Sequence, residues 1–190
     1  MENSLVVPGI TSNSTLTCLA RARTYQQYCA MVKQALAGRC IFCDPADEKI
    51  LFTGFFWRAW QNRFAEEHTR HHFMIVPIRH VVTIDELTTL EWRALQELFR
   101  RLKKEFGYTA AGVLVRDNAP ELAGTIEHLH FHVMVPDGTG RVETPFCKGS
   151  EKDGESLRRA IVFESLRRGV PFEDLPAVEQ ALVADRLGVK

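Results

Sequence analysis

The sequence has no net charge, no long hydrophobic run and no sign of a secretory leader. Its 190 residues contain 24 Lys and Arg against 24 Asp and Glu, so it lacks the basic excess with which proteins usually bind duplex DNA. Nucleic acid is therefore a poor candidate partner, whereas a small phosphorylated ligand needs only a few local donors. No stretch approaches the ~18 to 20 apolar residues of a membrane-spanning helix, so we expect no membrane association.

Cysteines are few, and their number is odd. The five thiols have no secretory context, because the first 14 residues carry an acidic second residue and an apolar stretch too short for a signal peptide. We therefore expect reduced thiols and a cytoplasmic location.

Hydrophobic periodicity predicts an α+β domain. The pattern indicates two short strands within 50–60, a strand over 72–78, a helix from Thr83 to Phe106 and strands over 112–117 and 129–135. Such an order is not a regular βαβ alternation, so we predict an antiparallel sheet of about five strands with the long helix on one face. We divide the chain into an N-terminal helical extension (1–37), a central domain (38–140) and a C-terminal helical extension (141–190).

Three histidines alternate with apolar residues in the last predicted strand, "EHLHFHVMVP" (127–136). Because side chains alternate along a strand, His128, His130 and His132 share one face at spacings of ~6.6 Å, while Phe131 and Val133 face the core. We expect the histidine face to be the open face of the sheet, with the imidazole of His130 exposed. An exposed polar strand without a function, or a metal site alone, would also fit this spacing.

The strand resembles the signature of the histidine triad (HIT) family, His-φ-His-φ-His-φ-φ with φ apolar, at every position. Upstream, "HFMIVPIRH" (72–80) resembles the family's His-x-φ-φ-φ-Pro-x-x-His segment, and "CIFCDP" (40–45) resembles its Cys-φ-φ-Cys entry. The resemblance covers about Cys40 to Pro136 and implies a HIT-like fold.

This resemblance also implies a structural Zn²⁺ site. The spacing of Cys40 and Cys43 lets both thiolates reach one ion. A redox pair, or two thiols without a function, would show the same spacing. In zinc-bearing members the other ligands are the histidine before the φ-φ-φ-Pro strand and the first triad histidine, here His72 and His128. Of the remaining histidines, we interpret His68 and His71 as surface residues and His80 as structural.

The activity implied by the resemblance is cleavage at the α-phosphate of a nucleotide ester, phosphoramidate or dinucleoside polyphosphate. His130 would be the nucleophile that forms a nucleotidyl-histidine, and His132 would stabilise charge on the phosphate oxygens. The hydroxyl of Thr125 would also contact the phosphate. Asn62 and Asn118 are candidate contacts to the nucleotide.

The sequence departs from the family pattern at one position before the triad. The Gln that usually precedes the Ser or Thr before the triad is missing from "DNAPELAGTIEHLH" (117–130). Either Gly124 replaces that Gln, which aligns Asp117 with the family's Asn, or the Gln is deleted, which aligns Asn118 with it. The alternative function is a zinc-stabilised nucleotide-binding module with little catalysis. Members of the family commonly form homodimers, but the terminal extensions could block or replace the dimer interface.

Overall fold

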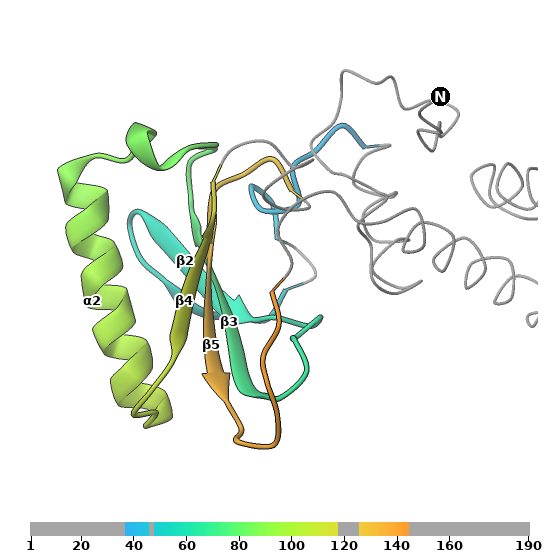
Figure 1. Cartoon of the computed structure of the whole chain (residues 1–190). Coiled ribbons are helices and arrows are strands. Elements are labelled where there is room, and N and C mark those ends of the chain that lie inside the picture. Colours follow the sequence, from blue (N-terminus) through green and yellow to red (C-terminus); the bar gives the residue numbers. More distant parts are fainter. Residues whose placement is uncertain (1–36, 46–47, 118–125, 145–190) are drawn as a thin grey trace, which may run out of the picture. The chain divides into compact units, whose positions relative to one another are not determined.

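The computed structural model describes residues 37–45, 48–117 and 126–144 (Figure 1). The predicted terminal helices, Asn118 and Thr125 lie outside these ranges. All described residues except 37–39 belong to one compact unit, Cys40–Cys147.

Five strands form a single antiparallel sheet in the order β1-β2-β3-β5-β4. The helices and strands, in chain order, are β1 (Ile50–Thr53), β2 (Trp57–Gln61), β3 (Thr69–Pro77), the 3₁₀ helix η2 (Ile84–Glu86), α2 (Thr89–Phe106), β4 (Gly112–Arg116) and β5 (His130–Pro136). Helix α2 lies along one face of the sheet (Figure 1). The predicted α+β fold with a five-stranded antiparallel sheet is confirmed.

The core lies between α2 and the sheet, as the alternation in β5 predicts. Phe131 and Val133 are buried there with Leu95 and Leu102 of the helix. The opposite face carries a smaller apolar cluster that includes Trp60 and is joined by Phe42. The histidine face of β5 therefore looks away from α2, toward this second cluster.

Helix α2 begins five residues later than the Thr83 capping box suggests. That capping box is present, but it starts only the 3₁₀ helix η2, and the backbone becomes extended again at Leu87. A second box starts the helix, because the Thr88 side chain accepts from the backbone of Glu91 while the Glu91 carboxylate accepts from the Thr88 backbone. The two capping boxes therefore divide the predicted helix into the short 3₁₀ helix η2 and the α-helix α2.

Glu91 also joins the helix to the segment that follows β3. Its carboxylate accepts two hydrogen bonds from Arg79, at 2.6 and 2.9 Å, and its backbone carbonyl accepts one from Trp57. Glu91 is 2% exposed. Its hydrogen bonds with Arg79 lower the pKa of the Glu91 carboxyl to about 2. This pair holds the 78–81 segment in place.

The residue that ends α2 requires a backbone conformation that favours glycine, and a substitution there tests this requirement. Gly107 terminates the helix in the left-handed conformation, at φ 59°. Gly107→Ala should lower the free energy of unfolding by about 1 to 2 kcal/mol, because a Cβ is disfavoured there. The measurement is denaturant unfolding, with Gly112→Ala as the control, since a Cβ at either position meets no atom within 4 Å. Equal stability of Gly107→Ala and wild type would contradict the expectation.

In the part of the chain that the structure describes, no helix combines the length and the apolar character needed to cross a bilayer.

Candidate functional site: a cysteine–histidine cluster beside the histidine triad

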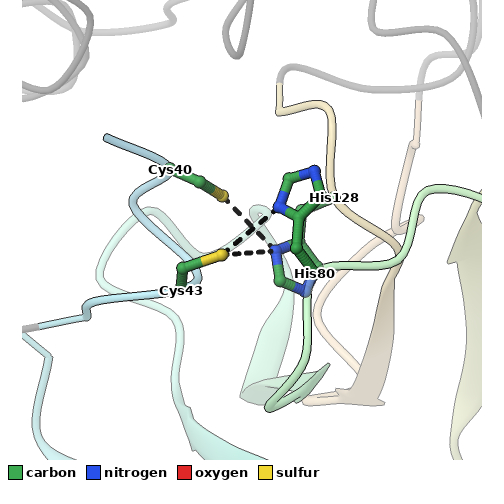
Figure 2. Close-up of side chains that lie close together, drawn as sticks. All are labelled: Cys40, Cys43, His80 and His128. Atoms are coloured by element: carbon green, nitrogen blue, oxygen red, sulfur yellow. Dashed lines mark hydrogen bonds between the residues drawn. The ribbon is translucent and has the colours of Figure 1, made fainter. Parts of the chain in front are cut away.

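Two cysteines and two histidines converge at the end of the sheet where β3 finishes and β5 begins. They are Cys40, Cys43, His80 and His128, whose potential ligand atoms all lie within 4.8 Å of one another. Figure 2 shows both sulfur atoms directed at the two imidazole rings. The cysteines come from the turn before β1, His80 follows β3, and His128 precedes β5.

The distances in the cluster fit a tetrahedral ion. Cys40 Sγ and Cys43 Sγ lie 3.3 and 3.6 Å from Nδ1 of His128, and Cys43 Sγ lies 3.3 Å from Nδ1 of His80. In an ideal tetrahedral zinc site, bond lengths of ~2.3 Å to sulfur and ~2.0 Å to nitrogen separate these atoms by about 3.6 Å. These three separations are therefore close to those expected around one shared ion, and all four donors lie within 4.8 Å of one another.

The protonation states also suit a metal. His128 donates from Nε2 to the carbonyl of Pro77 (3.2 Å), so its Nδ1 presents a lone pair to the sulfurs. Burial, followed by the adjacent Cys40, raises the pKa of the Cys43 thiol to about 11. A divalent cation between the thiols would offset both effects. The cluster is thus compatible with zinc.

The expected fourth ligand, His72, lies elsewhere, and the structure puts His80 beside the other three. The reason is the antiparallel register. His72 is opposite Met134, near the far end of β5, whereas His128 bonds to Pro77 at the end of β3. His72 is five residues from Pro77 along β3, about 16 Å at strand geometry. His80 follows the end of β3 and so reaches the cluster.

His130 is next to the cluster and points away from α2. Its Nδ1 donates to the carbonyl of His128 at 2.6 Å, so the neutral ring carries its lone pair on Nε2. Burial lowers the pKa of His130 to about 3, and the positive charge of Arg116, its partner on β4, acts in the same direction. The imidazole is therefore uncharged at neutral pH.

The exposure of His130 differs from the expectation. The strand alternation predicts an open imidazole, but the residue is only 4% exposed. The ring of Phe42, which lies between the two cysteines in sequence, packs edge-on against it with 4.9 Å between centroids. Sequence spacing cannot show this contact, because it joins the turn to a strand about 90 positions away.

His132 is hydrogen-bonded to His72, with 2.7 Å between His132 Nδ1 and His72 Nε2. Asn62 is next to them, since its Nδ2 lies 3.4 Å from His72 Nε2. Asp117, the alternative to Asn118 in the alignment, accepts a hydrogen bond from the Ile84 backbone at 2.8 Å. The structure thus brings His132 and His72 together and places Asn62 beside them.

Comparison with known proteins agrees with the geometry. Residues 63–139 match the HIT domain family. No curated protein sequence resembles the chain closely enough to count as a relative.

Solved structures of HIT proteins resemble the chain only distantly. A histidine triad protein from Clostridium difficile is 19% identical, with 56% of this chain and 95% of that chain covered at a TM-score of 0.42. A HIT family hydrolase from Clostridium thermocellum is 18% identical (55% and 96% covered, TM-score 0.44). A Zn-bound histidine triad family protein from Mycobacterium smegmatis is 19% identical (69% and 97% covered, TM-score 0.43). These likenesses are too remote to carry a functional argument. The family match and the triad together identify residues 63–139 as a HIT domain.

Proposed function

We propose that this HIT domain cleaves a nucleotide ester, phosphoramidate or dinucleoside polyphosphate at the α-phosphate, with His130 as the nucleophile. The match of residues 63–139 to the HIT domain family supports nucleotide binding and hydrolysis as the class of activity. In the first step, Nε2 of His130 attacks the α-phosphorus, an N–P bond forms, and the leaving group departs with the electrons of the broken bond. Water, phosphate or another acceptor then breaks the N–P bond and releases the nucleotide.

One observation carries the proposal: the 2.6 Å hydrogen bond from Nδ1 of His130 to the carbonyl of His128. It sets the tautomer and orients the ring, so the nitrogen with the lone pair is on the opposite side of the imidazole. His132, the next histidine on the same face, would donate to the oxygens of the phosphate. Thr125, Asn62 and Asn118 would make further contacts to the nucleotide.

Zinc belongs to the same proposal as a structural ion. Cys40, Cys43, His80 and His128 would hold it, and a four-coordinate site of this kind has no open position for substrate. Its role would be to hold the 40–45 turn, and with it Phe42, against β5. Arg58 of β2 also supports that turn, since it donates to the carbonyl of Cys43 at 3.0 Å.

We further propose that residues 38–140 are the catalytic domain, flanked by extensions 1–37 and 141–190. The substrate would be a small nucleotide, and the protein would act in the cytoplasm, with a homodimer as a further expectation.

The test is the covalent intermediate. Wild-type protein mixed with adenosine 5′-phosphoramidate or a diadenosine polyphosphate should gain the mass of one adenylyl group, which acid should release. His130→Ala should show neither the adduct nor turnover, with a loss of at least about 10³-fold.

A matched control is His68→Asn, because His68 lies outside the triad and its φ of 61° suits asparagine. It should form the adduct as wild type does. An adduct that persists in His130→Ala would overturn the assignment of the nucleophile.

The burial of His130 favours a second candidate, a zinc-stabilised nucleotide-binding module with little catalysis. That function would show as binding of AMP without adduct or turnover in wild-type protein. The same mass and turnover measurements therefore separate the two functions.

A further inference from the structure

The third histidine of the triad is hydrogen-bonded to a histidine on the neighbouring strand. His132 on β5 is opposite Met74 on β3, and His72 is two residues before Met74, so both imidazoles lie on the face away from α2. His72 is fully buried. Its Nε2 lies 2.7 Å from Nδ1 of His132, a distance at which one nitrogen must carry the proton and the other must accept it.

The backbone of the β2–β3 loop decides which nitrogen donates. The amide of Glu66 donates to Nδ1 of His72 at 3.0 Å. That nitrogen therefore bears a lone pair, and the proton of His72 is on Nε2. His72 is consequently a neutral imidazole that donates to His132.

The loop is held so that the Glu66 amide points at His72. The carboxamide oxygen of Asn62 accepts from the backbone of Phe64 at 3.0 Å, and the hydroxyl of Thr69 donates to the carbonyl of Glu66 at 2.6 Å. The amide nitrogen of Asn62 is 3.4 Å from His72 Nε2. With the proton on Nε2 these are two donors, so this longer approach is not a competing hydrogen bond.

The hydrogen bond from His72 also determines the tautomer of His132. Because its Nδ1 accepts from His72, the proton of its neutral ring is on Nε2. The Nε2 atoms of His130 and His132 thus differ in protonation. Nε2 of His130 offers a lone pair, and Nε2 of His132 offers a proton.

We propose that His72 is a positioning residue that, through the Glu66 amide, holds His132 in the Nε2–H tautomer, so that it donates to the phosphate of the bound nucleotide. The role of His132 in this inference rests on the proposed function; the tautomer does not. Without the donor at residue 72, His132 could place its proton on Nδ1 and present a second lone pair to the phosphate oxygens. Such a ring would repel the charge that it should stabilise.

The first measurement is ¹⁵N NMR of histidine-labelled protein, with the ring of His132 assigned by its loss in His132→Gln. Wild-type His132 should be the Nε2–H tautomer. In His72→Leu, which removes the donor but keeps an apolar side chain of similar size, the Nδ1–H tautomer should become populated. Wild-type His132 in the Nδ1–H form would overturn the proposal, whether or not the protein is an enzyme.

The second measurement compares His72→Leu with His72→Gln, because the amide N–H of glutamine can reach the position of Nε2. His72→Leu should lower kcat about 100-fold with little change in KM, since the lost contact acts on the transition state. His72→Gln should recover to within about 10-fold of wild type. The control is His71→Leu, one residue earlier, whose ring stacks on Phe73 on the α2 side of the sheet.

The two proposals fail in different ways. A wild type that forms no adduct refutes the proposed function, while the NMR result still decides the tautomer. Equal kcat losses in His72→Leu and His72→Gln, with the Nε2–H tautomer of His132 intact in both, would show that His72 acts only through packing and would overturn the inference.

Discussion

Zinc affinity should fall by about 100- to 1000-fold in His80→Ala and should stay within a few-fold of wild type in His72→Leu. Structural zinc sites bind with apparent free energies of about 10 to 16 kcal/mol, so one of four ligands contributes roughly 3 kcal/mol. His80 lies 3.3 Å from the sulfur of Cys43, whereas the two ring nitrogens of His72 bond to the Glu66 amide and to His132.

The measurement is competition between the protein and a chromophoric chelator, with zinc content checked by elemental analysis. Cys40→Ser serves as the positive control, because it removes a thiolate that every arrangement of the site requires. A metal-free wild type would refute the zinc site. Loss of zinc in His72→Leu but not in His80→Ala would restore the ligand set expected from the sequence.

Glu91→Gln should lower the free energy of unfolding at pH 7 by roughly 2 to 3 kcal/mol. Each pKa unit corresponds to about 1.4 kcal/mol, and the carboxyl of Glu91 shifts from 4.5 to about 2. Glutamine retains one oxygen acceptor, so part of the interaction with Arg79 survives. The expected loss therefore lies somewhat below the full value of the shift.

This contribution has a defined pH dependence. The pKa of Glu91 is lower in the folded protein, so the stabilisation is present above about pH 4.5 and disappears as the pH falls toward 2. The difference between wild type and Glu91→Gln, measured by denaturant unfolding at several pH values, should shrink over that range. Glu97→Gln is the control, because its carboxylate is exposed and pairs with Arg100 on the same helix, and it should change stability by less than about 0.5 kcal/mol. A difference that stays constant from pH 7 to 3 would contradict the assignment.

The orientation of β5 could be predicted because strand alternation is a local rule. Phe131 and Val133 had to face a core if His130 and His132 did not, and the structure agrees. The start of α2 was less predictable. Thr83 and Thr88 both begin capping boxes, and only the extended Leu87 between them separates the two.

The ligand set illustrates where local rules end. His72 and His128 both open predicted strands, but neighbouring strands of an antiparallel sheet begin at opposite edges. The antiparallel sheet was itself predicted, so the sequence contained the signal for His80, which follows Pro77 by three residues. The burial of His130 under Phe42 depends on tertiary packing and has no comparable local signal.

His128 takes part in two environments, since its imidazole faces the cysteines while its carbonyl accepts a hydrogen bond from Nδ1 of His130. An ion and a nucleotide that both depend on the placement of this one residue are thermodynamically linked. If the bound ion changes the affinity for nucleotide by some factor, the bound nucleotide changes the affinity for the ion by the same factor. An ion that holds His128 in place should raise the affinity for nucleotide, so saturating nucleotide should raise the equilibrium affinity for the metal by the same factor.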